Sequence, residues 1–330
     1  MMKTLLATAA ASVIAVAAHA QALQPALVYD LGGKFDQSFN QAAFTGAERF
    51  AEETGVAYRD FEIQNDAQRE QALRRFARQG YDPIIAIGFS HGAAVDKVAA
   101  EFPETDFAIV DMVVDQPNVR SILFKEQEGS YLVGMMAALK SETGVVGFVG
   151  GMDIPLIRKF QCGYVGGAKA VNPEIEVIAN MTGTDGSAWN NPTRGAELTR
   201  AQIDAGADVV YHAAGGTGVG VLQAAADAGA FGIGVDSNQN GMHPGSVLTS
   251  MLKRVDNAVY DTFTDALNDS FTPGFDVNGL AERGVGFAID ANNEDLLSAE
   301  MLAAVYEAAY DISTGDVMVH DYTSDGSCPY

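Results

Sequence analysis

The sequence predicts an α/β protein built from two doubly wound parallel-sheet lobes. Apolar strand-like runs alternate with amphipathic helix-like segments, an order typical of parallel sheets that helices cover on both faces. The alternation restarts near residue 127, which indicates a second sheet. The chain has 330 residues, of which 48% are hydrophobic, so it can form two hydrophobic cores and is not a disordered chain.

The first twenty residues have the pattern of a cleavable signal peptide. Lys3 provides a basic start, residues 5–17 are apolar, and Ala18, His19 and Ala20 match an A-x-A cleavage site. The apolar run is short for a membrane span, and no cysteine follows the cleavage site to carry a lipid. We therefore expect a periplasmic protein, secreted by a cleavable signal peptide and not lipid-anchored.

Residues 26–124 predict the first sheet and its helices. Strands are expected at 26–31, 56–63, 83–88, 106–111 and 119–124, and helices at 37–54, 67–79 and 91–102. In the first of these helices, Phe39, Ala43, Gly46 and Phe50 recur at the spacing of one helical face.

The second sheet is predicted from residue 127 onward. Strands are expected at 145–150, 175–181, 208–213, 231–236 and 247–252, and helices at 128–139, 155–171, 192–205, 218–228 and 255–268. The chain is expected to cross from one lobe to the other in three passages, near residues 124–127, 247–253 and 284–289. The predicted division is therefore residues 1–20 as signal peptide, 21–126 plus about 253–285 as the N-terminal lobe, and 127–252 plus about 286–330 as the C-terminal lobe.

The charge balance excludes some classes of partner. With 43 acidic and 20 basic residues the formal net charge is −23, so phosphate backbones repel the chain and no nucleic acid partner is expected. No Cys-x-x-Cys pair, paired histidine spacing or calcium loop occurs, so neither a metal nor a cofactor is expected.

Polar and glycine residues gather where the predicted strands end. In doubly wound sheets, ligands bind outside the carboxyl ends of the strands. The residues at or next to these ends include Asp30, Gly88, Phe89, Asp111, Gly215 and Asp236. Glycines permit close approach of the backbone, and carboxylates accept hydrogen bonds from hydroxyl groups. The pattern indicates a cleft between the lobes for a polar, uncharged ligand.

One motif also allows an enzyme. Residues 88–92 read G-F-S-H-G, which matches the nucleophile elbow of serine hydrolases, with Asp236 and either His243 or His320 as partners of Ser90. The other interpretation is a strand-to-helix turn in which Ser90 caps a helix. We favour the turn because a second complete doubly wound unit follows and no insertion resembles a lid.

Aromatic residues near the strand ends offer stacking surfaces. Phe39 is predicted in the first turn of its helix, level with the cleft, although it shares a face with Phe50. Phe89, Trp189 and Tyr211 are the other candidates. A flat ligand could stack on such rings.

Several blocks of sequence carry a family resemblance. They are D-L-G-G-K-F-D-Q-S-F-N at 30–40, F-A-I-V-D at 107–111, E-G-S-Y-L-V-G at 128–134, V-G-F-V-G-G at 146–151, A-G-G-T-G-V-G at 214–220, G-V-D at 234–236 and T-S-M-L-K at 249–253. Together, and in this order, they resemble the basic membrane protein family of substrate-binding proteins, which includes the purine nucleoside receptor A proteins.

This resemblance implies a non-enzymatic receptor of an ABC importer. The expected architecture is that of a type I periplasmic binding protein, in which two lobes close about a hinge. The expected ligand is a nucleoside, preferably a purine nucleoside, and the expected partner is an ABC permease in the inner membrane. A receptor of the same fold for a different small solute is the alternative. We expect a monomer.

The resemblance also implies roles for individual residues. Phe39 would stack on the base, Asn40 and Asp111 would read the base edges, Asp236 would bind the ribose hydroxyls, and Lys253 would lie beside them. The second stacking aromatic does not align cleanly, and Trp189 and Tyr211 are the candidates for it.

The two cysteines, Cys162 and Cys328, predict one disulfide. The expected compartment oxidises thiols, and a returning C-terminal tail would bring Cys328 to the second lobe. The bond would hold a terminus that otherwise frays. The alternative is a buried Cys162 and a free thiol on a loose tail.

Overall fold

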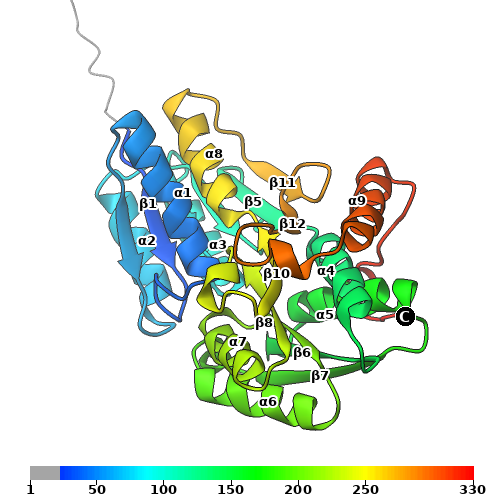
Figure 1. The fold of residues 1–330 in the computed structure, drawn as a ribbon. Coiled ribbons are helices and arrows are strands. Elements are labelled where there is room, and N and C mark those ends of the chain that lie inside the picture. The colour runs from blue at the N-terminus through cyan, green and yellow to red at the C-terminus, as the bar shows by residue number, and fades with distance from the viewer. Residues whose placement is uncertain (1–22) are drawn as a thin grey trace, which may run out of the picture.

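A computed structural model describes residues 23–330 of the chain (Figure 1). The predicted signal peptide, residues 1–20, lies outside the described residues. Two lobes, each with its own six-stranded sheet, make up the described part. The predicted fold class is confirmed.

The first sheet has the strand order β11-β5-β4-β3-β1-β2, and all of its strand pairs are parallel. Its strands are β1 (Ala26–Tyr29), β2 (Arg59–Glu62), β3 (Ile84–Ala86), β4 (Phe107–Val110), β5 (Val119–Phe124) and β11 (Gly274–Asn278). Its helices are α1 (Phe39–Thr54), α2 (Gln68–Arg78), α3 (Gly92–Glu101) and α8 (Val255–Leu267). One hydrophobic core lies under α1 and α8, and a second lies under α2 and α3.

The second sheet has the order β12-β10-β9-β8-β6-β7, with β12 antiparallel to β10 at its edge. Its strands are β6 (Val145–Met152), β7 (Glu176–Gly183), β8 (Val209–Ala213), β9 (Phe231–Asp236), β10 (Val247–Lys253) and β12 (Val285–Phe287). Its helices are α4 (Glu126–Lys140), α5 (Pro155–Val171), α6 (Pro192–Asp204), α7 (Gly218–Asp227) and α9 (Ala299–Thr314).

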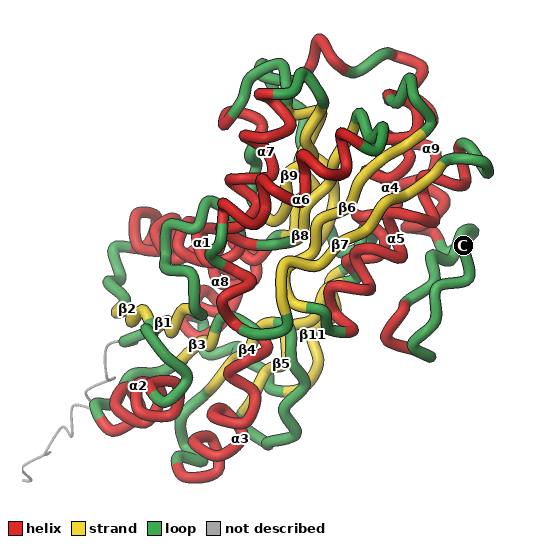
Figure 2. Tube along the Cα trace, turned by 90° about the horizontal axis from the view of Figure 1, so that it is seen from below, coloured by secondary structure: helices red, strands yellow, loops and turns green. Residues whose placement is uncertain are grey.

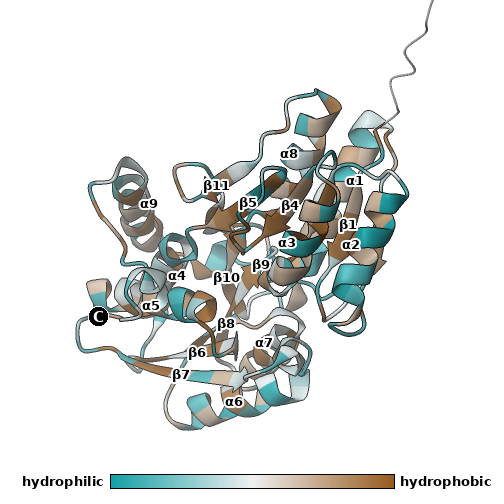
Figure 3. Cartoon of the chain, turned by 180° about the vertical axis from the view of Figure 1, so that it is seen from behind, coloured by the Kyte–Doolittle hydropathy of each residue, from teal (hydrophilic) through white to brown (hydrophobic). Residues whose placement is uncertain are grey.

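Helices cover both faces of the second sheet. The larger core packs α4, α5 and α9 against one face, and a smaller one packs α6 and α7 against the other. Figure 2 shows the strands of this sheet running between these two helix layers. In Figure 3 the strands are mostly hydrophobic, while outward-facing helices such as α2 and α6 carry hydrophilic residues.

The chain passes between the lobes three times. The passages run from β5 to α4, from β10 to α8, and from β11 to β12. The third passage falls between Asn278 and Val285, ahead of the 284–289 that the sequence predicts, because the short strand β12 already pairs with β10 in the second sheet. Leu280, inside this passage, packs against the cores of both lobes. The division into lobes stays a proposal, with its last boundary moved to this passage.

The C-terminal tail returns to the second lobe. A disulfide joins Cys328 to Cys162 on α5. Within residues 23–330, none of the helices has the length and apolar character that crossing a membrane requires.

Candidate binding site between the lobes

A cavity lies between the two lobes. It is bounded by the carboxyl ends of β1, β3 and β4 from the first lobe and of β8, β9 and β10 from the second, together with α5. This is the position that doubly wound sheets favour for ligands.

The structure gathers most of the predicted site residues around this cavity. Those that line it are Asp30, Phe39, Asn40, Phe89, Asp111, Trp189, Gly215, Asp236 and Lys253. They come from strand ends or from the loops and helix starts that follow them. The sequence pattern predicted most of them, and the family resemblance added Asn40 and Lys253. Their roles in binding stay a proposal.

Tyr211 does not reach the cavity, which contradicts its predicted stacking role. Its side chain is fully buried in the core of the second lobe, where the ring contacts those of Phe148 and Tyr164 at centroid distances of 5.5 and 5.2 Å. Its hydroxyl lies 3.3 Å from Ser130 Oγ. The physical reason is that Tyr211 is in the middle of β8, where alternation turns its side chain toward the helix layer.

Aromatic rings from both lobes form walls of the cavity. Phe39 begins α1, and Phe89 lies in the short 3-10 helix (Phe89–His91) after β3. Trp189 ends a 3-10 helix (Gly186–Trp189) of the second lobe, and its ring meets Phe89 edge-to-face at 6.4 Å. Trp189 rests against Gly151, where a Cβ atom would lie 2.1 Å from the indole ring. Only glycine permits this close contact.

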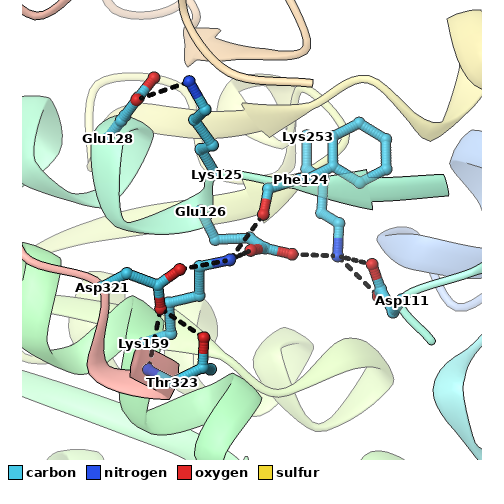
Figure 4. A network of polar contacts seen from close by, with 9 residues as sticks. All are labelled: Asp111, Phe124, Lys125, Glu126, Glu128, Lys159, Lys253, Asp321 and Thr323. Atoms are coloured by element: carbon cyan, nitrogen blue, oxygen red, sulfur yellow. Dashed lines mark hydrogen bonds and ion pairs between the residues drawn. The ribbon is translucent and has the colours of Figure 1, made fainter. Parts of the chain in front are cut away.

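Lys253 is the buried cation of the site (Figure 4). Its Nζ lies 2.7 and 2.6 Å from the two carboxylate oxygens of Asp111 and 2.9 Å from Glu126 Oε1. Burial alone would lower the pKa of Lys253, but the facing carboxylates outweigh it and raise the pKa, so the ammonium stays charged. The ring of Phe39 lies 5.1 Å from the same ammonium group.

Two aspartates end their strands in an unusual backbone conformation. Asp111 has φ 68° and Asp236 has φ 63°, in the left-handed region that non-glycine residues rarely adopt. Burial is the main cause that raises the pKa of each to about 6. Asp236 Oδ2 accepts a hydrogen bond from Ser38 Oγ of the first lobe at 2.5 Å, which leaves Oδ1 for another donor.

The amide of Asn40 is already used within the first lobe. Its Oδ1 accepts from the backbone N of Asp30 at 3.2 Å, and its Nδ2 donates to Asp30 O and Gly33 O at 3.2 and 3.1 Å. Because both amide hydrogens are taken, we assign Asn40 to holding the loop between β1 and α1. This differs from the base-reading role that the resemblance implies.

Some residues of the site have no local sequence signal. Leu156, Ile157 and Phe160 of α5 add an apolar wall to the cavity. Glu126 and Ser38 become relevant only through their contacts with Lys253 and Asp236. Sequence spacing could not show these contacts, because the partners are far apart in the chain.

The hydrolase alternative finds no support in this geometry. Among the hydrogen bonds of residues 23–330, none joins Ser90 to a histidine; its hydroxyl instead lies beside the carboxylate of Asp30. Asp236 pairs with Ser38, and His320 bonds to Asp325 in the C-terminal tail. The G-x-S-x-G segment is thus a strand-to-helix turn.

No group of three or more potential metal ligands is arranged around a common point in the described part of the chain.

Comparison with known proteins identifies relatives over most of the chain. The "CD4+ T-cell-stimulating antigen" of Listeria monocytogenes is 35% identical, covering 89% of this chain and 87% of the relative. The "ABC transporter nucleoside-binding protein BmpA" of Lactococcus lactis is 32% identical, covering 90% and 89%. The crystal structure of a solute-binding protein of an ABC transporter system from Aeropyrum pernix matches with a TM-score of 0.83 at 31% identity, covering 91% and 93%.

These relatives also correct the predicted localisation. Proteins of Pyrococcus horikoshii and Pyrococcus furiosus, 32% and 34% identical to this chain, are named lipoproteins. These names contradict the prediction of an unanchored periplasmic protein, which is therefore wrong. The prediction rested on the absence of a cysteine directly after the predicted cleavage site. That site lies outside the described residues.

The family itself follows from the match to a family model. The model for the Bmp family, described as "ABC transporter substrate-binding protein PnrA-like", matches residues 24–311, which include both sheets and every residue that lines the cavity. The chain therefore belongs to the PnrA-like family of ABC transporter substrate-binding proteins.

Proposed function

We propose that this protein binds a nucleoside in the cavity between its lobes and delivers it to an ABC permease. The observation that carries the proposal is the combination of aromatic rings and buried carboxylates around one cavity. Phe39 and Trp189 offer flat apolar faces, while Asp236 and Asp111 offer hydrogen-bond acceptors. A nucleoside has the complementary chemistry, a flat base joined to a sugar that carries hydroxyl donors.

The free oxygen of Asp236 suits the sugar. Oδ1 is not engaged by Ser38, and an ionised carboxylate accepts hydroxyl hydrogen bonds more strongly than a neutral group. Asp111 is held by Lys253 through both of its oxygens, and each carboxylate oxygen keeps a further lone pair, so Asp111 can accept a hydrogen bond from an N–H group of the base. The name of the Lactococcus lactis relative, a nucleoside-binding protein, supports the same class of ligand.

The proposal is tested by calorimetric titration of the protein with adenosine, guanosine, inosine, uridine and cytidine. The free bases and ribose serve as partial ligands. We expect a nucleoside to bind and each partial ligand to bind much more weakly, because neither engages both the rings and the carboxylates. Binding of an amino acid or a sugar instead, with no response to any nucleoside, would assign the cavity to a different solute.

A matched pair of variants tests the stacking role. Phe39→Leu keeps an apolar side chain but removes the aromatic face, which should weaken nucleoside binding by about 5- to 100-fold. Phe44→Leu is the control, because Phe44 lies on the same helix and packs against Phe35 away from the cavity lining. Equal effects of the two variants would remove Phe39 from the stacking role.

A further inference from the structure

The C-terminal tail, residues 316–330, lies beyond the 24–311 that the family model matches. It runs back along α5, where Figure 1 shows the end of the chain. Two of its contacts are the disulfide from Cys328 to Cys162 and the ring of Tyr330 over Gly166. At Gly166 a Cβ atom would lie 2.6 Å from that ring, so the glycine makes room for it.

A third contact is ionic. Asp321 Oδ2 lies 3.6 Å from Lys159 Nζ. Lys159, Cys162 and Gly166 are spaced i, i+3 and i+7, so the tail is fixed along one face of α5. The tail is thus held by a covalent bond, a ring contact and an ion pair on a single helix.

The same helix also forms a wall of the binding cavity. Leu156, Ile157 and Phe160 line the cavity. They lie on the first turns of α5, interleaved with the residues that contact the tail. A shift of α5 therefore moves both the tail contacts and the cavity wall, because the helix is a rigid element.

Lys159 connects the tail to the hinge. Its ammonium donates to the carbonyl of Phe124 at 2.7 Å and lies 2.9 Å from Glu126 Oε2. Both partners belong to the β5-to-α4 passage between the lobes. A lysine has three N–H donors; Phe124 and Glu126 take two of them, and Asp321 faces the ammonium as an ion pair at 3.6 Å.

Glu126 continues the chain of charges to the ligand site. Its other oxygen, Oε1, lies 2.9 Å from Lys253 Nζ, and Lys253 in turn holds Asp111. Lys253 ends β10, next to the second passage between the lobes. Figure 4 shows this ion-pair chain, which runs from the tail through Lys159, Glu126 and Lys253 to Asp111.

We propose that the C-terminal tail is a strap that adjusts ligand affinity from outside the cavity. The tail holds α5 and Lys159, and Lys159 with Glu126 fixes the orientation of Lys253. Lys159 and Glu126 are positioning residues in this proposal, because they act on the ligand through Lys253 and Asp111. The inference rests on the cavity being the substrate site of this family and not on the ligand being a nucleoside.

Asp321→Asn is the sharpest test of the strap. The asparagine keeps the size of the side chain and can still accept from the backbone N of Thr323, but it removes the charge facing Lys159. We expect the dissociation constant of the tightest nucleoside found by calorimetry to rise by about 2- to 10-fold. Asp321→Glu should restore part of the affinity. Asp316→Asn is the control, because Asp316 is in the same tail and contacts Thr314.

The covalent part of the strap is tested by the double variant Cys162→Ser, Cys328→Ser, which leaves no free thiol. Hydrogen exchange of the backbone amides at 124–126, 155–163 and 251–254 gives a readout that needs no ligand. We expect faster exchange in all three segments. A failure of every nucleoside to bind wild-type protein would refute the proposed ligand and leave this readout intact.

The result that overturns the strap is specific. It is an unchanged nucleoside dissociation constant and unchanged exchange at 124–126 and 251–254 in both tail variants, with only a lower melting temperature. The tail would then stabilise the second lobe without any effect on the hinge.

Discussion

Asp236 combines burial, a left-handed backbone and a raised pKa at one position. The pKa of about 6 lies above the ~3.9 of an unfolded aspartate. A raised carboxyl pKa contributes stability that is present below about pH 4 and is lost as the pH rises through about 6. At neutral pH the protein therefore keeps an unfavourable buried charge at the position that we assign to the ligand.

Replacing Asp236 by asparagine should stabilise the protein and weaken binding. Asparagine keeps the shape, tolerates the left-handed backbone and still accepts from Ser38. From the pKa difference, the free energy of unfolding at pH 7.5 should rise by up to ~3 kcal/mol. Affinity for ribonucleosides should fall more than affinity for 2′-deoxyribonucleosides. Urea unfolding between pH 4 and 8, with calorimetry at pH 7.5, measures both effects.

Asp290→Asn is the control with the opposite sign. Hydrogen bonds from Asn238 and Asn292 hold the pKa of Asp290 below its ordinary value, so its loss should reduce stability above about pH 4. A lower free energy of unfolding for Asp236→Asn than for the wild type at pH 7.5 would contradict the inference that the buried carboxylate destabilises the folded protein.

Single residues also show where sequence reasoning stops. Asp236 and Asp111 could be predicted because an acidic residue directly after a buried strand lies at the ligand edge of a parallel sheet. Tyr211 precedes the end of its strand by two residues, and alternation buries it. The role of Asn40 depends on hydrogen bonds to a loop that folds back on it, which no local pattern reveals.

At the scale of elements, the 3-10 helix that carries Trp189 depends on its contact with β6. Thr182 Oγ1 lies 3.2 Å from Gly151 O and 3.1 Å from Ala188 O, so its one hydrogen is shared between them, and the hydroxyl of Thr217 donates to Ala188 O at 2.7 Å. These bonds fix the backbone beside Trp189. The position of the indole ring then depends on the space above Gly151.

Gly151→Ala should displace Trp189. The added methyl would lie 2.1 Å from the ring, so the indole must move. Since this is the only tryptophan of the chain, its fluorescence emission should shift, and nucleoside affinity should fall by about 5-fold or more. Gly286→Ala, on β12 with nothing within 4 Å of the new methyl, should change neither measurement. Unaltered emission from Gly151→Ala would contradict the close contact.

Most elements could be predicted from periodicity alone. The strands at 119–124 and 231–236 and the helix at 155–171 have the predicted ends, because turn residues or proline bound them. The strand β11 gave no such signal, since it is short and exposed, and its pairing with β5 joins segments about 150 residues apart. Long-range pairing of this kind decided where the third passage lies.

At the scale of the whole molecule, the lobes touch directly across the cleft. Ser38 Oγ donates to Asp236, Ser237 Oγ donates to Ser38 O at 2.8 Å, and Gln239 Nε2 donates to Gln37 O at 3.0 Å. The rings of Phe89 and Trp189 add another contact between the lobes. The structure is therefore a closed arrangement of the two lobes.

Ser38→Ala should shift the protein toward an open form. A hydrogen bond to a charged acceptor contributes about 1.5–3 kcal/mol, so its loss should lower the closed-to-open ratio by roughly tenfold or more. Small-angle scattering should show a larger radius of gyration for this variant, and saturating nucleoside should reduce it. Ser270→Ala, which removes an exposed hydroxyl from the first lobe, should scatter like the wild type. An identical radius for all three proteins would mean that this bond does not hold the lobes together.

The disulfide between Cys162 and Cys328 joins two residues that are 166 positions apart, so the chain between them forms a covalently closed ring. This ring contains α8 and β11, the elements of the first lobe that follow the second lobe's sheet in the chain. It also contains the passages from β10 to α8 and from β11 to β12. A protease that cuts any one loop inside the ring leaves the two fragments in one molecule. The two fragments of such a cleaved chain stay joined by the disulfide until a reductant breaks it. Cleavage of these loops therefore leaves the molecule in one piece wherever thiols remain oxidised.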